Sequence, residues 1–484
     1  MTRSHIAAVD SGEQRSSREA LTALLNRQRE AFEADPYPSA EQRIEDITRL
    51  KDALIKHEKM LAEAMNSDFG CRARDESLLG DVLPSVMGAR YAAGKVRKWM
   101  KPERRHVSPL HQPAKARVVY QPLGVVGIVV PWNYPVYLAM GPLIAALAAG
   151  NRAMIKVSEF APETGKAVRQ VLDECFDEDK VAVIEGDAEV AQAFTALPFD
   201  HLLFTGSTAV GRLVMKAAAE HLTPVTLELG GKSPTIIDDE IPMDMAVERF
   251  LWGKDINAGQ TCVATDYILC PESRVDELLA SARKLQKRLY PDEMSNPDFA
   301  SIINERQFER LSGWLDEVRN TDARVEPLGG SDLRPDPEKR RFPLTAVVNP
   351  PADTKVAQEE IFGPLLPIIT YRDLEDAASI IRRGTRPLAL YVMSLNKDVQ
   401  EFFIRNTHAG GMCINDSVMQ VAQDDLPFGG VGASGIGHYH AREGFLTFSH
   451  AKSVFERGKL SFANLVFPPY GRWSHKLVRK LYMR

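Results

Sequence analysis

The chain has 484 residues, 44% hydrophobic and 26% charged, which is typical of a globular protein with sizeable cores. Its length predicts about three domains, and its formal net charge of -5 argues against nucleic acid as a partner. The five cysteines form no C-x-x-C pair, which argues against a disulfide framework or a zinc site and indicates a reducing, cytoplasmic location. The first residues lack the apolar core of a signal peptide.

Apolar residues spaced by three and four predict two amphipathic helices within residues 15–66, and the second continues to a terminal Gly70. Strand and helix signals then alternate from about residue 125 to 229, which predicts a doubly wound parallel sheet. The expected strands are GVVGIVV, RAMIKV, VAVIEG, HLLFTG and PVTLELG. A second alternation, from residue 231 to about 420, predicts another α/β unit.

The uncharged run at residues 118–151 has the length and composition of a membrane helix. Pro131, Pro135 and Pro142 interrupt it, however, and its two halves are typical of a buried parallel strand and a buried helix. We therefore expect no membrane span here.

Several loops at strand ends have cofactor-binding character. In FTGSTAVG, Gly206, Ser207 and Gly211 follow a strand and open a helix, which suits a phosphate group, although a simple glycine-rich turn is an equally good interpretation. Lys156 and Glu159 lie at the end of another strand, a place that suits side chains which bind ribose hydroxyls. The alternative interpretation is that both are exposed loop charges. The formal G-x-G-x-x-G at residues 430–435 follows no strand, and we interpret it as a tight loop.

Three residues are candidates for catalysis. Glu228 ends an apolar strand, where a partly desolvated carboxyl would be a base or a salt-bridge partner. Asn133 lies between two prolines. Its side-chain amide could donate a hydrogen bond to an oxyanion, or it could be a turn residue whose hydrogen bonds are made within the protein. Cys262 alone is better explained as a buried thiol than as a nucleophile, because most free cysteines are buried. No cluster of metal ligands is present in the sequence pattern.

Taken together and in order, the motifs PWNYP, KVSE, FTGSTAVG, LELGGKSP, GQTCVA, EEIFGP and PFGGVGASGIG resemble those of the aldehyde dehydrogenase superfamily over residues 45–455. The Asp266–Tyr267 pair after the cysteine is similar to that of the class 3 branch. Two departures from that branch are Thr265, where proline is usual, and the segment Ala441-Arg442-Glu443.

The resemblance implies roles for individual residues. Cys262 would be the nucleophile, which the site should favour as thiolate, with Glu228 as the water-activating base and Asn133 as the oxyanion donor. The cofactor would contact a further set: Trp132, Lys156, Glu159, Gly206, Ser207, Thr208, Gly211, Glu360 and Phe362. Cys270, in the apolar segment DYILC, is the better candidate for a buried packing residue.

The resemblance also implies three parts: a dinucleotide-binding domain at 1–106 and 125–229, a catalytic domain at 230–420, and a bridging, oligomerising element at 107–124 and 421–484. The expected activity is oxidation of an aldehyde to the acid with NAD, and NADP also accepted, without a metal. Glu159 favours NAD because it would face a 2′-phosphate. The substrate would be a phenylpropenoid aldehyde such as coniferyl aldehyde, or a medium- to long-chain aliphatic one.

The alternatives are an enzyme that passes the acyl group to coenzyme A and a catalytically silent binding or structural member of the superfamily. Retention of both Glu228 and Cys262 argues against each of them. We expect a homodimer, with the basic, apolar tail GRWSHKLVRKLYMR packed on the partner subunit rather than on a membrane.

Overall fold

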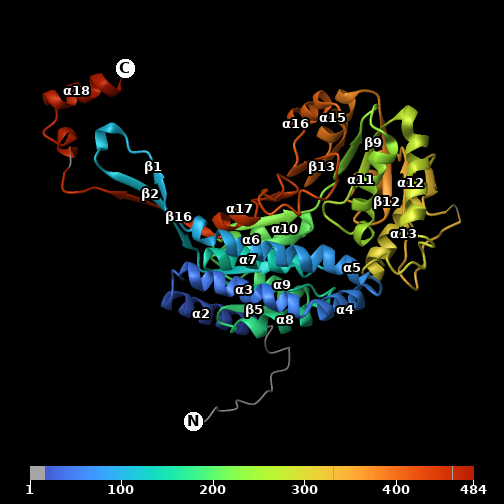
Figure 1. Cartoon of the computed structure of the whole chain (residues 1–484), viewed down its shortest axis with the longest axis horizontal. Coiled ribbons are helices and arrows are strands. Elements are labelled where there is room, and N and C mark those ends of the chain that lie inside the picture. The colour runs from blue at the N-terminus through green and yellow to red at the C-terminus, as the bar shows by residue number, and fades with distance from the viewer. Residues whose placement is uncertain (1–16, 331, 461, 484) are drawn as a thin grey trace, which may run out of the picture.

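The computed structural model describes residues 17–330, 332–460 and 462–483. The expectation about a signal peptide concerns the first residues and lies outside this part of the chain. Three sheets of six, seven and three strands organise the described residues. The six-stranded sheet is central in Figure 1, with the seven-stranded sheet on one side and the three-stranded sheet projecting on the other.

The six-stranded sheet confirms the doubly wound prediction. Its strands, in spatial order, are β15 (Gly435–Ile436), β7 (Val225–Leu229), β6 (His201–Gly206), β3 (Val125–Val129), β4 (Arg152–Lys156) and β5 (Val181–Ile184). The strands are parallel except for β15, which pairs antiparallel with β7. One face is covered by α3 (Ala40–Lys56), α6 (Leu83–Trp99), α7 (Tyr137–Ala149) and α8 (Pro162–Cys175). The other is covered by α2 (Arg18–Ala34), α9 (Ala188–Thr195) and α10 (Thr208–Ala219).

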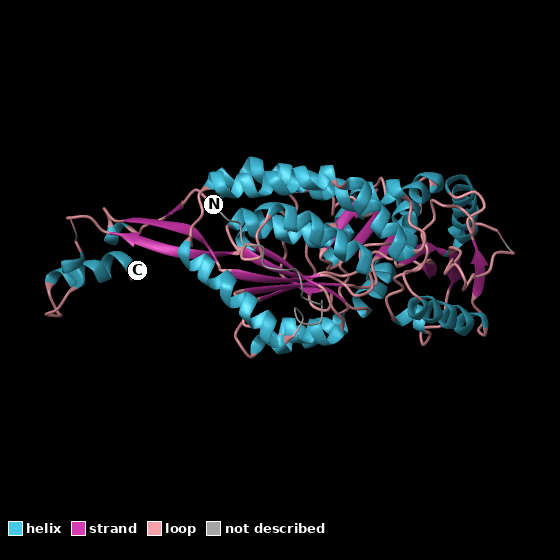
Figure 2. Cartoon of the chain, turned by 90° about the horizontal axis from the view of Figure 1, so that it is seen from below, coloured by secondary structure: helices cyan, strands magenta, loops and turns pink. Residues whose placement is uncertain are grey.

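Burial on both faces explains why the strands are apolar throughout. In β3, Val126 and Ile128 join one core while Val125 and Val129 join the other. Figure 2 shows the sheet between its two layers of helices. The uncharged run that resembles a membrane helix forms β3 and the buried helix α7, and no helix among the described residues is long and apolar enough to cross a membrane.

The seven-stranded sheet forms the second α/β unit. Its order is β10 (Arg324–Pro327), β11 (Thr345–Val348), β12 (Leu365–Tyr371), β9 (Tyr267–Pro271), β8 (Pro234–Ile237), β13 (Ala389–Met393) and β14 (Gly411–Ile414). Helices α11 (Met243–Asp255) and α12 (Val275–Leu289) pack on one face, and α13 (Glu305–Arg319), α15 (Leu374–Arg383) and α16 (Lys397–Asn406) on the other. The short helix α14 (Lys355–Gln358) precedes β12. Cys270 lies fully buried in β9, as a packing residue.

The N-terminal helices differ from the sequence prediction. The segment predicted as one helix up to Gly70 is two, because α3 ends at Lys56 and α4 (Glu58–Phe69) begins after His57. At the break, Lys56 and His57 both bond to Glu174 of α8, at 2.6 and 2.7 Å. Gly70 ends α4 with φ of 77°, as its position predicted. After it come α5 (Arg74–Ser77) and a π-helical turn at Leu78–Val82.

The three-stranded antiparallel sheet contains β1 (Glu103–Arg105), β2 (Lys115–Pro122) and β16 (Ser449–Glu456), the last preceded by α17 (Ala441–Thr447). The hairpin therefore begins a few residues before the expected 107–124. Beyond β16, a 3-10 turn at Ala463–Val466 and α18 (Trp473–Tyr482) form an arm at the far end of the molecule (Figure 1). The segment 421–484 thus contributes to two sheets, since β15 belongs to the six-stranded one.

Candidate active site

The strand order of the six-stranded sheet explains why distant motifs meet. Across the sheet, β4 and β5 follow β3 toward one edge, whereas β6 and β7 follow each other toward the opposite edge. The strand order therefore reverses between β3 and β6, although the two strands are parallel. Loops that follow neighbouring strands at such a switch point diverge and leave a crevice at the carboxyl edge of the sheet. Trp132 and Asn133 follow β3, Lys156 ends β4, and Gly206 ends β6. These residues therefore share one edge.

Cys262 lies in a tight turn between α11 and β9, on the seven-stranded unit. Three consecutive residues before it, Asn257, Ala258 and Gly259, have φ of 53°, 50° and 74°. Glycine is required at 259, because an added Cβ would lie 2.5 Å from the carbonyl oxygen of Gly363. This backbone turns the cysteine away from the helix and leaves its side chain partly exposed.

The buried Gln260 side chain fixes this turn. Its amide nitrogen donates to the carbonyl oxygens of Asn257 and Ser301, each at 3.0 Å, and its amide oxygen accepts from the Ile303 N–H at 3.0 Å. Both ends of the amide are therefore satisfied, which holds the residue two positions before the thiol. The motif GQTCVA contains this glutamine, but the motif alone does not predict that it fixes the turn.

Asn133 is tied directly to the same turn. Its side-chain Nδ2 donates to the Gln260 carbonyl oxygen at 3.2 Å, and its own carbonyl oxygen accepts from Asn257 Nδ2 at 3.0 Å. The side chain is buried. An amide nitrogen carries two hydrogens, so one remains for another acceptor beside Cys262. The structure thus brings together two of the predicted catalytic residues.

Glu228, the third, lies on β7 with 2% of its surface exposed. Neither carboxyl oxygen has a hydrogen-bond partner among the described residues. Burial raises the pKa of Glu228 well above its usual value. The carboxyl is also close enough to Cys262 to contribute to raising the pKa of the thiol. An unpartnered buried carboxyl facing a cysteine is a group available for proton transfer.

The expected sources that favour the thiolate of Cys262 are helix dipoles and the positive ring of the cofactor, whereas the chain's own groups act against it. Burial, then the carboxyls of Glu360 and Glu228, raise the pKa of Cys262 to about 12. Backbone hydrogen bonds to the sulfur act in the opposite direction but do not compensate. The chain's own groups therefore hold Cys262 as a thiol, and deprotonation must accompany binding or reaction.

Glu360 approaches the cysteine from the loop before β12. Burial raises its pKa to about 8, while a hydrogen bond from the Gly231 N–H lowers it in part. A Cβ on Gly230 would lie 2.0 Å from Glu360 Oε2, so this glycine allows the carboxyl its position. Lys232 and Asp266 hold the two loops together: Lys232 Nζ donates to Asp266 and to the Glu359 carbonyl oxygen at 2.8 Å, and Asp266 accepts from the Ile361 N–H at 2.7 Å.

Aromatic rings line the same loops. Phe362 and Trp132 pack edge to face with their centroids 5.3 Å apart. Phe362 has φ of 45°, an unusual backbone for a bulky residue, and it places the ring across the crevice from the six-stranded sheet. The side chains of Trp132 and Glu360 thus lie on facing loops of the two units.

The remaining predicted cofactor residues lie along the switch point. Lys156 is buried, donates to the Val157 carbonyl oxygen at 2.6 Å, and lies 4.0 Å from the Glu159 carboxyl. Ser207 is the N-cap of α10, where its hydroxyl accepts from the Val210 N–H. Thr208 donates to the Ala433 carbonyl oxygen at 3.0 Å.

The glycines around α10 pack closely against side chains. A Cβ on Gly211 would lie 2.6 Å from Leu229, so this glycine allows α10 to approach β7. A Cβ on Gly206 would meet the Phe204 ring at 2.5 Å. The G-x-G-x-x-G segment at residues 430–435 forms a turn against β7, in agreement with the prediction of a tight loop. Gly435 pairs with Glu228 in the register of the two strands.

A buried ion pair holds the loop that carries Asn133. No local pattern in the sequence predicts this pair. Arg72 and Asp81 have fully buried side chains 2.9 Å apart. Arg72 also donates to the Asn133 carbonyl oxygen at 3.2 Å, and Asp81 accepts from the N–H groups of Val136 and Tyr137 at 3.1 and 3.0 Å. The pair therefore fixes both the loop that carries Asn133 and the start of α7.

The departure at Thr265 is also explained by a contact. Its buried hydroxyl forms a hydrogen bond with the Thr235 hydroxyl of β8 at 2.8 Å. This bond ties the segment between Cys262 and β9 to the neighbouring strand β8.

Comparison with known proteins places these observations in one family. The sequence pattern of the aldehyde dehydrogenase family matches residues 2–454. The chain is 53% identical, over 96% of both chains, to a protein named probable coniferyl aldehyde dehydrogenase from Pseudomonas aeruginosa. It is 42% identical, over 96% of both, to coniferyl aldehyde dehydrogenase from Pseudomonas sp..

Solved structures agree. An aldehyde dehydrogenase from Staphylococcus aureus, described as the substrate-bound state of AldH, superposes with a TM-score of 0.90 at 34% identity, covering 98% of this chain and 100% of that one. A Mycobacterium tuberculosis aldehyde dehydrogenase complexed with NAD+ superposes with a TM-score of 0.83 at 30% identity, covering 92% of each.

Proposed function

The chain belongs to the aldehyde dehydrogenase family, and we propose that it oxidises an aromatic, phenylpropenoid-type aldehyde such as coniferyl aldehyde to the acid, using NAD. The observation that carries this proposal is the convergence of Cys262, Glu228 and Asn133 from three separate segments. The relatives named coniferyl aldehyde dehydrogenase, at 42% and 53% identity, support the substrate class.

The reaction begins at the Cys262 sulfur. The thiol transfers its proton to a water molecule and the sulfur attacks the aldehyde carbon, so that the carbonyl oxygen becomes an oxyanion. The free N–H of the Asn133 amide and the backbone N–H of Cys262 donate to this oxygen. One such donor typically contributes about 3–4 kcal/mol to the transition state. Because Gln260 and Arg72 already fix the loops, the donors need no reorganisation when the charge develops.

Glu228 acts in the second half. Oxidation leaves the acyl group as a thioester on Cys262, and Glu228 takes a proton from the water that hydrolyses it. Its raised pKa makes the carboxylate a stronger base than an exposed glutamate. Acyl transfer to coenzyme A would not need this base, and a silent binding protein would need neither residue.

The residues at the switch point fit a dinucleotide. The Thr205 hydroxyl at the end of β6 is buried without a partner among the described residues, and the N-terminus of α10 directly follows it. Gly206, Ser207 and Thr208 would face the phosphates, and Lys156 and Glu159 the adenosine ribose. Trp132, Phe362 and Glu360 would border the nicotinamide half. The bound nicotinamide supplies the hydride acceptor. Glu159 favours NAD over NADP, because a 2′-phosphate would meet a carboxylate.

We propose that the six-stranded unit binds the cofactor, that the seven-stranded unit carries the nucleophile, and that the three-stranded sheet with the C-terminal arm bridges two subunits. We also propose a homodimer in a reducing, cytoplasmic environment. Several large apolar side chains of the C-terminal arm are more than half exposed: Leu460, Phe462, Tyr470, Trp473 and Leu481. A partner subunit would cover them. Light scattering should give twice the chain mass, and deletion of residues 457–484 should weaken this association.

A panel of aldehydes tests the function. The purified chain with NAD should form NADH with coniferyl aldehyde and cinnamaldehyde at a higher kcat/KM than with hexanal. Cys262→Ala should bind NAD but form no NADH. Efficient turnover of aliphatic aldehydes alone would replace the aromatic substrate by a medium- to long-chain one, and normal turnover by Cys262→Ala would overturn the mechanism.

A further inference from the structure

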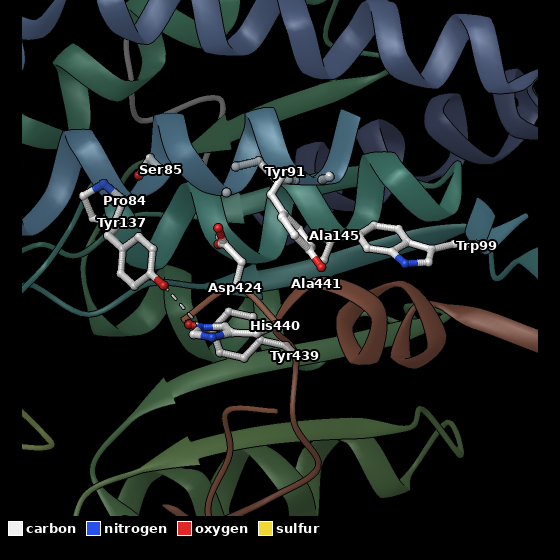
Figure 3. A pocket seen from close by; sticks show the side chains of 14 residues that line it. Pro84, Ser85, Tyr91, Trp99, Tyr137, Ala145, Asp424, Tyr439, His440 and Ala441 are labelled. Carbon is white, nitrogen blue, oxygen red and sulfur yellow. Dashed lines mark hydrogen bonds between the residues drawn. The ribbon is translucent and has the colours of Figure 1, made fainter. Parts of the chain in front are cut away.

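The space between α6, α7 and the segment that leads into α17 has room for about 40 Å³, which suits a water molecule and not an aromatic ring (Figure 3). The Tyr137 hydroxyl and His440 Nε2 in its wall already form a hydrogen bond at 3.2 Å. The charged groups that could select a ligand lie instead at the carboxyl edge of the six-stranded sheet. They are Glu159 after β4 and Glu185 and Asp187 after β5.

The loops after β4 and β5 lie side by side, because the two strands are parallel neighbours that end at the same edge of the sheet. Beyond the last residue of β4, the Val157 N–H still donates to the Ile184 carbonyl oxygen at the end of β5, at 3.1 Å. Glu159 and Asp187 each stand three residues after their strand, and both are exposed. The two carboxyls therefore face the same region of the edge.

The ammonium group of Lys156, the last residue of β4, is close to both loops. It donates to the Val157 carbonyl oxygen at 2.6 Å and lies 4.0 Å from the Glu159 carboxyl. Burial lowers the pKa of Lys156, whereas the carboxyls of Glu159, Asp187 and Glu185 raise it. An ammonium group has three hydrogens, so two remain for another acceptor. Carboxyls from two loops thus surround the cation that would bind the adenosine ribose.

Two of these three carboxyls keep their charge available. Glu185 is paired, because Arg169 Nε donates to it at 2.6 Å. Asp187 caps α9 with one oxygen only, since its Oδ1 accepts from two N–H groups of the first turn, at 2.9 and 3.2 Å. No hydrogen bond or salt bridge within the described part of the chain engages its Oδ2. Asp187 is therefore the second free negative charge beside Lys156, after Glu159.

Asp187 also borders open space. Together with Gly186 and the first residues of α2 and α9, it lines an open cavity of about 470 Å³, which has ample room for a phosphate group. The charged residues in this wall are Asp187 and Glu189 against Arg18, so its net charge is negative. A phosphate that entered here would meet repulsion.

We propose that Asp187 is a second determinant of cofactor choice, which together with Glu159 disfavours a 2′-phosphate on the adenosine ribose. A 2′-hydroxyl can donate a hydrogen bond to either carboxylate, whereas a phosphate carries a charge of about −1.5 to −2 at pH 7. The inference rests on the proposed function, which places this ribose at Lys156 and Glu159. It deepens that proposal, because the choice between NAD and NADP then depends on two loops and not on Glu159 alone.

Binding to the cofactor-free enzyme tests the inference without turnover. Calorimetry gives the Kd values of ADP-ribose and of 2′-phospho-ADP-ribose for the wild type, Glu159→Gln, Asp187→Asn and the double variant. Asparagine keeps an oxygen that can cap α9, so the fold should be retained. The wild type should bind ADP-ribose more tightly. Each single substitution should reduce the ratio of the two Kd values by about twofold to tenfold, and the double variant should approach the product of the two effects.

Glu220→Gln is the matched control. It removes the same charge from the far end of α10, about 20 Å along the helix from Ser207 at its start, and should leave the ratio unchanged. Salt provides a second readout, because raising the ionic strength from about 0.1 to 1 M shortens the screening length from about 10 to 3 Å and should reduce the wild-type ratio.

An unchanged ratio in Asp187→Asn would overturn the inference, and so would an equal reduction in Glu220→Gln. A wild-type ratio that does not respond to salt would also contradict it. Failure of the wild type to bind ADP-ribose at all would instead contradict the proposed cofactor site at this edge of the sheet.

Discussion

Replacement of Asp81 by asparagine tests how much the negative charge of the buried Arg72–Asp81 pair contributes to stability and to the position of Asn133. The substitution preserves shape and leaves an oxygen able to accept from the N–H groups of Val136 and Tyr137. It removes the ionic bond to Arg72, whose guanidinium then has only Glu76, at 3.3 Å, as a carboxylate partner. At the 2.9 Å separation of Arg72 and Asp81 and an effective dielectric constant of about 20, the Coulomb attraction is about 6 kcal/mol.

Part of this attraction offsets the desolvation of the two charges, so the expected net loss of stability in Asp81→Asn is about 3–5 kcal/mol. The melting temperature, followed by calorimetry, should fall clearly, and kcat should fall with it because Asn133 loses its support. Glu163→Gln breaks the exposed pair with Lys166 and should leave both quantities unchanged. An Asp81→Asn variant as stable and as active as the wild type would refute the assigned role of the pair.

Two further predictions concern the carboxyls around the thiol. Alkylation of Cys262 by iodoacetamide in the cofactor-free enzyme should still accelerate by up to about tenfold per pH unit at pH 9.5, because its raised pKa means that the thiolate fraction is still rising there; a plateau near pH 7 would contradict a thiol buried beside two carboxyls. Gly230→Ala should displace Glu360, since its Cβ would lie 2.0 Å from Oε2, and should raise the KM for NAD by about tenfold or more. Gly458→Ala, with open space around the new Cβ, is the control, and an unchanged KM in Gly230→Ala would exclude Glu360 from cofactor binding.

The sequence predicted the strands from their alternation with helices, and it predicted the approach of Cys262, Glu228 and Asn133 through the resemblance of their motifs to one family. Glu228 and Asn133 lie at the carboxyl ends of parallel strands of one sheet, whereas Cys262 reaches them from a turn before β9 of the other sheet. The sequence could not predict the break at His57, where the chain contacts Glu174 more than a hundred residues away. Nor could it distinguish Asp424 from Asp425, since only the fold decides which carboxyl accepts a hydrogen bond from Tyr91.

The pKa of Cys262 in the chain alone could not be predicted from the sequence either. The motif indicated a nucleophilic thiol, and helix dipoles and the positive ring of the cofactor were the candidate sources that would favour its thiolate. The structure shows burial and two carboxyls acting on the same sulfur, which raises the pKa instead. Summed effects of this kind depend on distances between segments and cannot be obtained from spacing along the chain.

The division of labour between Cys262 and Glu228 is tested most directly by rapid-mixing kinetics of Glu228→Gln. The substitution keeps the shape of the buried side chain, so the fold should be retained. We predict a first turnover that forms about one NADH per site at nearly the wild-type rate, followed by a steady state slower by about a hundredfold to ten-thousandfold, because the thioester on Cys262 lacks its base. A wild-type steady-state rate in this variant would contradict the account.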